Sequence, residues 1–227
     1  MKTPSTGFRN FALSVALCSA ATLASPQQPA PEHTTDGLQL QKQTAQRLVY
    51  LRPGASFSQY RRVAILDCYV EFQKNWQQDY NRSMVDPAKR VSDADMTRMK
   101  NALSQEFKGV FAEELQKGGY QVVDTAAPDV LVLRPALVNV QVTAPDIMTA
   151  GIDATVVRSA GQMTLYLELW DSATNKILAR VSDAQADQQP FAQRASGVTN
   201  KAAADLILRQ WADELRSHLQ AVRSQAG

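Results

Sequence analysis

Residues 162–186 read QMTLYLELWDSATNKILARVSDAQA, and this stretch decides the fold class. Apolar residues alternate with polar ones through its first nine positions, which is the period of a strand with one buried face. The polar residues 171–175 (DSATN) form a turn, and residues 176–186 return as the second strand. Two long strands joined by a tight turn must pair antiparallel, so the sheet is not wholly parallel. The residues expected to point inward are Met163, Leu165, Leu167 and Leu169.

Two amphipathic helices are predicted, one before this hairpin and one after it. The first begins after Ser92, a favourable N-cap residue, with Asp95 in the position that completes a capping box. Gly118-Gly119 ends it. Its apolar stripe recurs every three or four positions and consists of Met96, Met99, Leu103, Phe107, Val110, Phe111 and Leu115. The second helix is expected over residues 199–220, with a stripe of Leu206, Ile207, Trp211, Leu215 and Leu219.

Further strands are expected at residues 48–51, 62–72, 120–123 and 130–142. Pro135 lies inside the last of these, which indicates a bulge, an edge or two abutting strands. Alternation gives the strand at 62–72 a wholly apolar face made of Ala64, Leu66, Cys68, Val70 and Phe72. Cys68 is therefore expected to be a buried small hydrophobe. Together the elements predict an α/β fold of the α+β type: a mixed, largely antiparallel sheet with the two amphipathic helices packed on one face.

The N-terminus has the order of a secretory signal, which is positive, then apolar, then small. Residues 1–10 contain Lys2 and Arg9 without an acid, residues 11–23 form an apolar run, and Ala24 completes a cleavage motif. The predicted division is a signal peptide at 1–24, a proline-rich flexible linker at 25–35 and a single globular domain at 36–227. The alternative is a lipoprotein signal with lipidation at Cys18, although Leu17 is bulky where that peptidase requires a small residue.

The balance of charge limits the classes of partner. The chain has 24 basic and 22 acidic residues, and without Lys2 and Arg9 the two signs balance at 22 each. A neutral domain has no electrostatic reason to bind nucleic acid or an anionic membrane surface. Membrane contact is expected only through a lipid anchor, if Cys18 is modified. Cleavage after Ala24 would leave Cys68 as the only cysteine, so no internal disulfide is expected.

The sequence has no recognisable catalytic, metal-binding or cofactor-binding motif, so no catalytic residue, metal or cofactor is predicted. His33 and His218 have no Cys, Asp or Glu neighbours at metal-ligand spacing. No phosphate-binding glycine loop follows a strand, and no nucleophile elbow occurs. Carboxylate chemistry stays open through four acids on strands or at strand ends, for which a solvated outer face is the alternative interpretation: Asp67, Glu71, Glu168 and Asp171.

Two long segments are candidate partner-binding surfaces, because loops on a rigid scaffold often carry function. Residues 73–90 are interpreted as an irregular loop and residues 145–158 as a second one. Trp, Tyr and Arg are enriched at interface hot spots, and the candidate residues of the first segment are Trp76, Tyr80, Arg82 and Met84. In the alternative interpretation, Trp76 and Tyr80 fold back over the open face of the sheet.

The segments at 36–38 (DGL), 51–60 (LRPGASFSQY) and 167–174 (LELWDSAT) resemble signatures of the bacterial domain-of-unknown-function 3313 family. The likeness runs from Asp36 to about Trp211, and the segment Arg-Pro-Gly-x-x-Phe-x-x-Tyr is its most specific part. Many members are named as envelope lipoproteins, so the resemblance implies a periplasmic or outer-membrane location. It implies no established activity and no catalytic residues. Leu17 departs from the small residue that this family usually has before the lipidated cysteine.

The most specific of these segments also has a structural interpretation that does not depend on the family. Pro53-Gly54 turns the chain, and Phe57 and Tyr60 pack the turn against the next strand. Ligand binding by the same segment is the alternative.

Two hypotheses of function are compatible with the sequence. The leading one is a non-catalytic periplasmic or envelope-assembly module that binds another envelope protein. The second is a carboxylate-dependent hydrolase that acts on a cell-wall or outer-membrane component. A deep pocket lined by two of the four acids would favour the hydrolase. A shallow surface flanked by the two long segments would favour the binding module.

Overall fold

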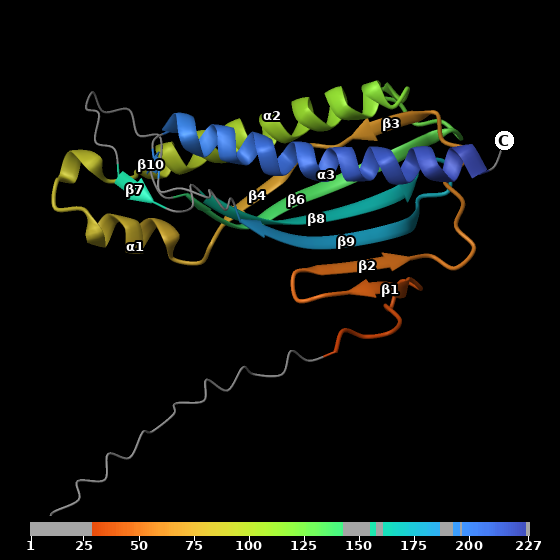
Figure 1. The fold of residues 1–227 in the computed structure, drawn as a ribbon, viewed down its shortest axis with the longest axis horizontal. Helices are drawn as coiled ribbons and strands as arrows, with labels where there is room; N and C mark the ends of the chain where they lie inside the picture. The colour runs from red at the N-terminus through yellow and green to blue at the C-terminus, as the bar shows by residue number, and fades with distance from the viewer. Residues whose placement is uncertain (1–28, 143–154, 158–160, 187–192, 196, 226–227) are drawn as a thin grey trace, which may run out of the picture.

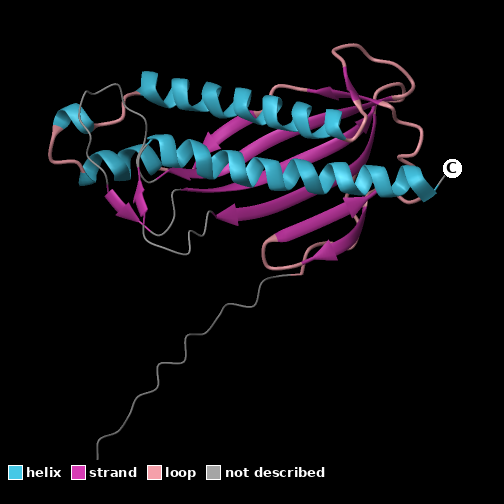
Figure 2. Cartoon of the chain, turned by 45° about the horizontal axis from the view of Figure 1, so that its top comes forward, coloured by secondary structure: helices cyan, strands magenta, loops and turns pink. Residues whose placement is uncertain are grey.

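The computed structural model describes residues 29–142, 155–157, 161–186, 193–195 and 197–225. Two long helices, α2 (Asp93–Lys117) and α3 (Gly197–Gln225), cover one face of a sheet (Figures 1 and 2). This two-layer arrangement confirms the predicted α+β fold class. The strands are β1 (Gln39–Gln43), β2 (Arg47–Leu51), β3 (Arg62–Ile65), β4 (Tyr69–Phe72), β5 (Gln121–Val122), β6 (Val130–Val142), β7 (Thr155–Val157), β8 (Gly161–Asp171), β9 (Lys176–Ala186) and β10 (Gln193–Ala195).

The main sheet is mixed and largely antiparallel, as predicted. Its eight strands follow the order β1-β2-β9-β8-β6-β3-β5, with β4 also paired to β6. The strands from β1 to β6 along this order pair antiparallel, whereas β3, β4 and β5 join in parallel. β7 and β10 form a separate antiparallel pair. The segment 145–158, predicted to be a loop, therefore contains strand β7, and its other residues lie outside the described chain.

The hairpin of β8 and β9 forms as predicted, with Leu165 opposite Asp183 and Leu167 opposite Val181. The Asp171 carboxylate closes the turn by accepting hydrogen bonds from the backbone N–H (2.6 Å) and the hydroxyl (2.7 Å) of Thr174. The four residues predicted to point inward are all buried: Met163, Leu165, Leu167 and Leu169.

Helix α2 confirms both its predicted cap and its predicted stripe. Ser92 Oγ accepts a hydrogen bond from the Asp95 N–H at 3.2 Å, and the Asp95 carboxylate accepts one from the Ser92 N–H at 2.9 Å. Phe107 and Phe111 are fully buried and stacked, with 4.0 Å between ring centroids. After the helix, Gly119 adopts a φ of +79°, a left-handed conformation that favours glycine.

The predicted stripe of α3 is wrong at one position. Ile207 and Trp211 are buried as expected, but Leu206 is 58% exposed and Leu208 is buried in its place. Consecutive residues of a helix are rotated by about 100°. Because Ile207, Leu208 and Trp211 together face the sheet, Leu206 lies beyond the edge of the buried face.

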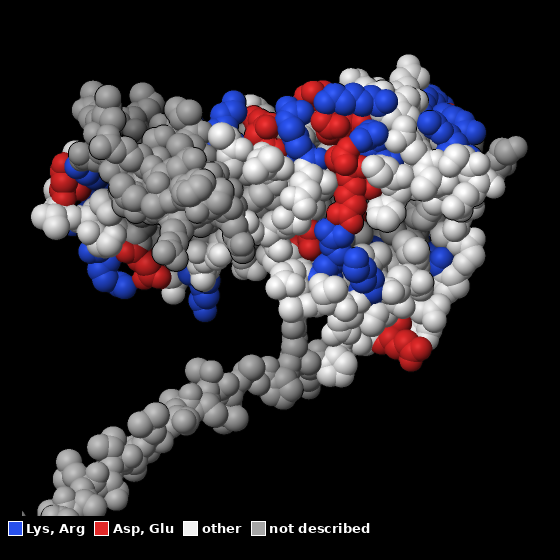
Figure 3. Space-filling view, in the orientation of Figure 1, with Lys and Arg blue, Asp and Glu red and all other residues white. Residues whose placement is uncertain are grey.

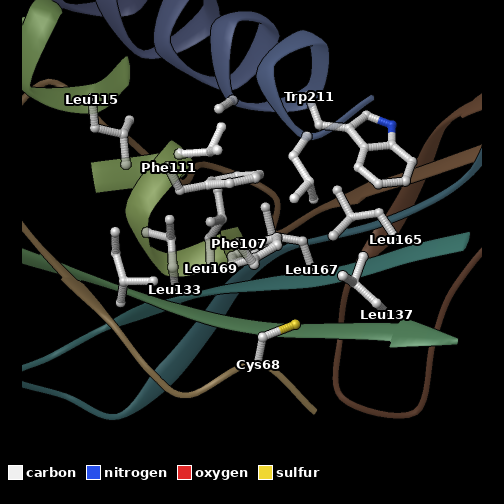
Figure 4. Close-up of a cluster of buried hydrophobic side chains, with 14 of the residues drawn as sticks. Cys68, Phe107, Phe111, Leu115, Leu133, Leu137, Leu165, Leu167, Leu169 and Trp211 are labelled. Carbon is white, nitrogen blue, oxygen red and sulfur yellow. The ribbon is translucent and has the colours of Figure 1, made fainter. Parts of the chain in front are cut away.

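The core lies between the two helices and the sheet (Figure 4). Phe107 and Phe111 of α2 and Trp211 of α3 pack over the leucines of β6 and β8. Cys68 is buried against this core, as predicted. Burial raises the pKa of its thiol to about 12, which keeps the thiol protonated and unreactive at neutral pH.

The predicted strand at 62–72 is two strands, β3 and β4, separated by residues 66–68. Ile65 lies opposite Leu133 of β6, and Tyr69 lies opposite Ala136. The chain therefore holds one more residue than β6 across the break, and one extra residue reverses which side chains face the core.

This break explains why the predicted inward face of the strand is only half correct. Cys68, Val70 and Phe72 face the core as expected, but Ile65 faces it before the break and Leu66 is exposed. Pro135 of β6 lies in register with the break. Proline has no N–H to donate to a neighbouring strand, so the parallel ladder cannot continue at this position.

The segment at 73–90, predicted to be irregular, contains a helix, α1 (Trp76–Ser83), and a 3-10 turn at Pro87–Lys89. The helix follows Asn75, which has a left-handed φ of 64° and makes no side-chain capping bond. Asn75 and Gln78 are residue types of a helix N-terminus, but the segment has no apolar period that would indicate a helix. The prediction therefore failed at α1.

Candidate functional site

Helix α1 lies at the end of the molecule away from the C-terminus (Figure 1). The Trp76 ring packs on Phe72 of β4 with 4.8 Å between centroids, and Tyr80 stacks on Trp76 at 5.5 Å. At the next position, the Asn81 side chain accepts a hydrogen bond from the Val91 N–H (2.7 Å) and donates one to the Val91 carbonyl (2.8 Å). These contacts fix α1 against β4 and the start of α2.

The four predicted partner-binding residues have different surroundings. Trp76 and Tyr80 come together in the ring stack and are half-buried, and Met84 just after the helix is half-buried as well. Arg82 is exposed and pairs with Asp79 at 3.0 Å. Val85 stands outside the predicted set although it is 96% exposed. A single valine in a polar segment forms no apolar pattern from which its exposure could be predicted. Its exposure is known only from the structure.

A groove of about 710 Å³ opens between the N-terminal halves of α2 and α3. Its volume lies in the range of small-molecule binding sites. The apolar part of its lining comes from the sheet and from both helices: Phe72, Val140, Met163, Met99, Leu103 and Ile207.

Charged side chains of both signs gather over α2 and α3 (Figure 3). Lys201 of α3 pairs with Glu106 of α2 at 3.6 Å, and Arg209 pairs with Glu113 at 3.1 Å. Further along, the Arg223 side chain donates to the carbonyl of Gly118 at 3.0 Å. From one contact to the next, the residue numbers rise along α2 and along α3 alike. The two helices therefore run parallel.

None of the four acids that the hydrolase hypothesis requires lines this groove. Asp67 is 95% exposed and lies 3.8 Å from the Lys108 ammonium. Glu71 is exposed and accepts a hydrogen bond from the Tyr69 hydroxyl. Glu168 is buried, and its carboxylate accepts hydrogen bonds from the guanidinium of Arg180 at 2.9 Å.

The fourth acid, Asp171, joins two of the segments that resemble family signatures. The Tyr60 hydroxyl donates to its carboxylate at 2.6 Å in the buried interior, and this bond is the main reason why the pKa of Asp171 is lowered. Arg52 donates to the carbonyls of Asp36 (2.9 Å) and Ile177 (2.6 Å). Gly54 supports the turn between Arg52 and Tyr60 with a left-handed φ of 74°. These residues therefore tie the N-terminal segment, the turn and the hairpin together, which is a structural role.

The family model described as Protein of unknown function (DUF3313) matches residues 34–215. The chain belongs to this family. The search of curated proteins found no match. Within the described residues, no helix is both long and apolar enough to cross a membrane.

Several solved structures are similar at low identity. Protein XCC0632 from Xanthomonas campestris has a TM-score of 0.42 at 12% identity, over 78% of this chain and 92% of that one. The PelC dodecamer from Paraburkholderia phytofirmans has a TM-score of 0.37 at 12% identity, over 73% and 96%. A minor lipoprotein from Acinetobacter baumannii has a TM-score of 0.35 at 11% identity, over 72% and 95%. All three TM-scores lie below 0.5, so these similarities establish neither a shared fold nor a shared function.

A buried polar cluster around Asp183 of β9 was missed by sequence reasoning. The Asp183 carboxylate accepts hydrogen bonds from Trp211 of α3 (2.6 Å) and Arg47 of β2 (2.8 Å). Burial pushes the pKa of Asp183 up, but these bonds and one from Gln185 outweigh it and lower the pKa. Counting back from the pair Asp171–Lys176 would have placed Ser182 opposite Leu165. The register shift between Leu169 and Trp170 moves the pairing by one residue and brings Asp183 opposite Leu165, on the inward face.

The histidines give no sign of a metal site. His218 is exposed and lies 3.7 Å from the Glu214 carboxylate. His33 pairs through its backbone with Gln39. In the described part of the chain, no three His, Cys, Asp or Glu side chains are grouped so that they could hold a metal ion.

Proposed function

We propose that this chain is an exported, non-catalytic binding module of the bacterial envelope, and that it binds another envelope protein through the surface of α1. The observation that carries the proposal is the exposure of Arg82 on α1 and of Val85 two residues after its end. The Phe72–Trp76–Tyr80 stack fixes this helix to the domain. A fixed platform binds with less loss of conformational entropy than a mobile loop.

The chemistry of this surface suits a protein partner. Arg82 offers a guanidinium, Tyr80 and Met84 offer half-buried apolar atoms, and Val85 adds an exposed apolar side chain. Arginine, aromatic residues and methionine are enriched in protein interfaces. Trp76 has a supporting role in this proposal, because its ring joins α1 to β4.

The location belongs to the same proposal. The order of residues 1–24 supports export and cleavage before Ser25. Membership of a family of unknown function is compatible with an envelope protein. Lipidation at Cys18 is the alternative route to the same compartment.

The proposal is tested with immobilised protein and envelope extract. The double variant Arg82→Ala, Val85→Ser should lose capture of the partner while its melting temperature stays within a few degrees of the wild type, because both side chains are exposed. Leu206→Ser removes an exposed apolar residue from α3 and should capture the partner normally. Trp76→Ala should lower stability instead, because it removes the ring between Phe72 and Tyr80. Undiminished capture by the double variant would exclude α1 as the interface.

A further inference from the structure

In the lining of the groove between α2 and α3, α2 lacks a side chain at one position. Gly109 lies in the helix interior, and a Cβ atom added there would meet nothing within 4 Å. Glycine destabilises a helix interior by comparison with alanine, and neither a positive φ nor close packing requires it here. Ala102 and Ala204 also line the groove with small side chains. The apolar floor can therefore be reached between the two helices.

Two ion pairs limit the width of an occupant. Glu106–Lys201 and Glu113–Arg209 connect the helices, and all four residues line the groove. A helix with its side chains has a diameter of about 10 Å, so a helical peptide could reach the floor only by breaking these pairs. A single hydrocarbon chain is thinner than a helix, so it is the better candidate for an occupant that leaves both pairs in place.

The charges around the groove compensate one another. An occupant with a net charge along its length would have to compete with existing ion pairs, whereas an uncharged chain complements an apolar floor whose rim is already paired. The pairs are Arg98 with Asp95 (2.6 Å), Lys201 with Glu106 (3.6 Å), and Arg209 with Asp205 (2.9 Å) and Glu113 (3.1 Å).

We infer that this groove binds one unbranched acyl chain of a single-chain amphiphile, with the polar headgroup left in solvent. The apolar lining and the compensated rim both fit that chemistry. Met99 and Met163 in the lining are flexible thioethers, which adapt to an irregular apolar ligand. This site is separate from the surface proposed for the protein partner, and either can fail without the other.

The first test uses cis-parinaric acid, a linear fatty acid that fluoresces in apolar surroundings, titrated into the purified full chain. The wild type should bind it saturably. Gly109→Phe places a ring inside the groove and should weaken binding by about tenfold or more. Asn101→Phe places the same ring at an exposed position of α2 outside the groove and should bind like the wild type. If Gly109→Phe lowers the melting temperature, Ala102→Phe, which also lies in the groove lining, is used in its place and should weaken binding by the same amount.

The second test compares competitors of equal chain length. Palmitate and palmitoyl lysophosphatidylcholine should displace the probe at concentrations within about threefold of each other, because the headgroup stays outside a compensated rim. A helical amphipathic peptide should not displace it. The inference is overturned if the wild type binds no fatty acid, if groove-filling variants bind it normally, or if the peptide displaces the probe and the lipids do not.

Discussion

Asp183 joins three elements through a single carboxylate. It accepts hydrogen bonds from Arg47 of β2 and Trp211 of α3, and it lies on β9 itself. Arg47 also pairs with Glu214 of α3, which strengthens the connection between the edge of the sheet and the helix. A buried charge is costly unless it is paired, so the contribution of this cluster depends on the ionised carboxylate.

The lowered pKa of Asp183 predicts how stability changes with pH. A carboxyl whose folded pKa is depressed stabilises the fold above its unfolded value of about 3.9, and this contribution is lost as the pH falls through the folded pKa. Asp183→Asn should therefore lower the free energy of unfolding by about 2 kcal/mol at pH 7. In urea unfolding, the difference from the wild type should shrink by pH 3. Asp67→Asn, at an exposed carboxylate, is the control, and a pH-independent difference for Asp183→Asn would contradict the assignment.

Phe107 tests which face of α2 forms the core. The ring is fully buried and stacked on Phe111, so Phe107→Ala should lower the free energy of unfolding by about 3–5 kcal/mol. Leu206→Ala is the matched control, since an exposed position of α3 should change stability by less than about 1 kcal/mol. Equal losses for the two variants, measured by denaturant unfolding, would mean that the helix packing is misassigned.

At the scale of elements, the capping box of α2 makes a prediction of its own. Ser92→Ala removes the side chain that accepts from the Asp95 N–H and should cost about 1 kcal/mol. Asn101→Ala changes an exposed position inside the same helix and should be neutral or slightly stabilising. Thermal unfolding of both variants measures the difference. A loss at Asn101 as large as that at Ser92 would exclude a specific capping effect.

Elements with a strong local pattern could be predicted from sequence. The α2 stripe and cap, and the alternation and turn of the β8–β9 hairpin, depend on residues close together in the chain. The break between β3 and β4 depends on Pro135, which belongs to strand β6. The break therefore cannot be predicted from residues 62–72 alone. Strand β1 was missed because Gln39–Gln43 reads as a polar stretch with one apolar residue, paired at the edge of the sheet.

The candidate sites were less predictable than the elements. Tyr80 and Arg82 could be selected by residue type, but the exposure of Val85 and the anchoring of Trp76 on Phe72 are tertiary facts. The groove requires α2 and α3 to lie side by side and parallel, and ion pairs such as Glu113–Arg209 that connect residues far apart in sequence mark this arrangement. The apolar period of a helix predicts which of its faces is buried, but it does not predict which other helix lies beside it.

For the whole molecule, the two proposed sites lie at the same end. Phe72 lines the groove and also packs against Trp76, which anchors α1. If both proposals hold, one end of the sheet supports the partner surface and the acyl-chain groove together.

Processing of the N-terminus tests the proposed compartment. The exported protein should begin at Ser25 and be released by osmotic shock, because residues 1–24 have the order of a cleavable signal. N-terminal sequencing of the protein from a periplasmic fraction checks this. If the N-terminus is instead a blocked, lipid-modified Cys18 in the membrane fraction, the protein is a lipoprotein and the predicted cleavage before Ser25 is wrong. An intact Met1 in the cytoplasm would contradict export altogether.

The central claim, that the α1 surface binds an envelope protein, is tested most directly by site-specific photo-crosslinking in intact cells. A photoreactive amino acid replaces Val85 in one variant and Leu206, an exposed apolar residue on α3, in a second variant. The account predicts a covalent adduct with one envelope protein from position 85 and none from position 206. No adduct from position 85, or the same adducts from both positions, would contradict it.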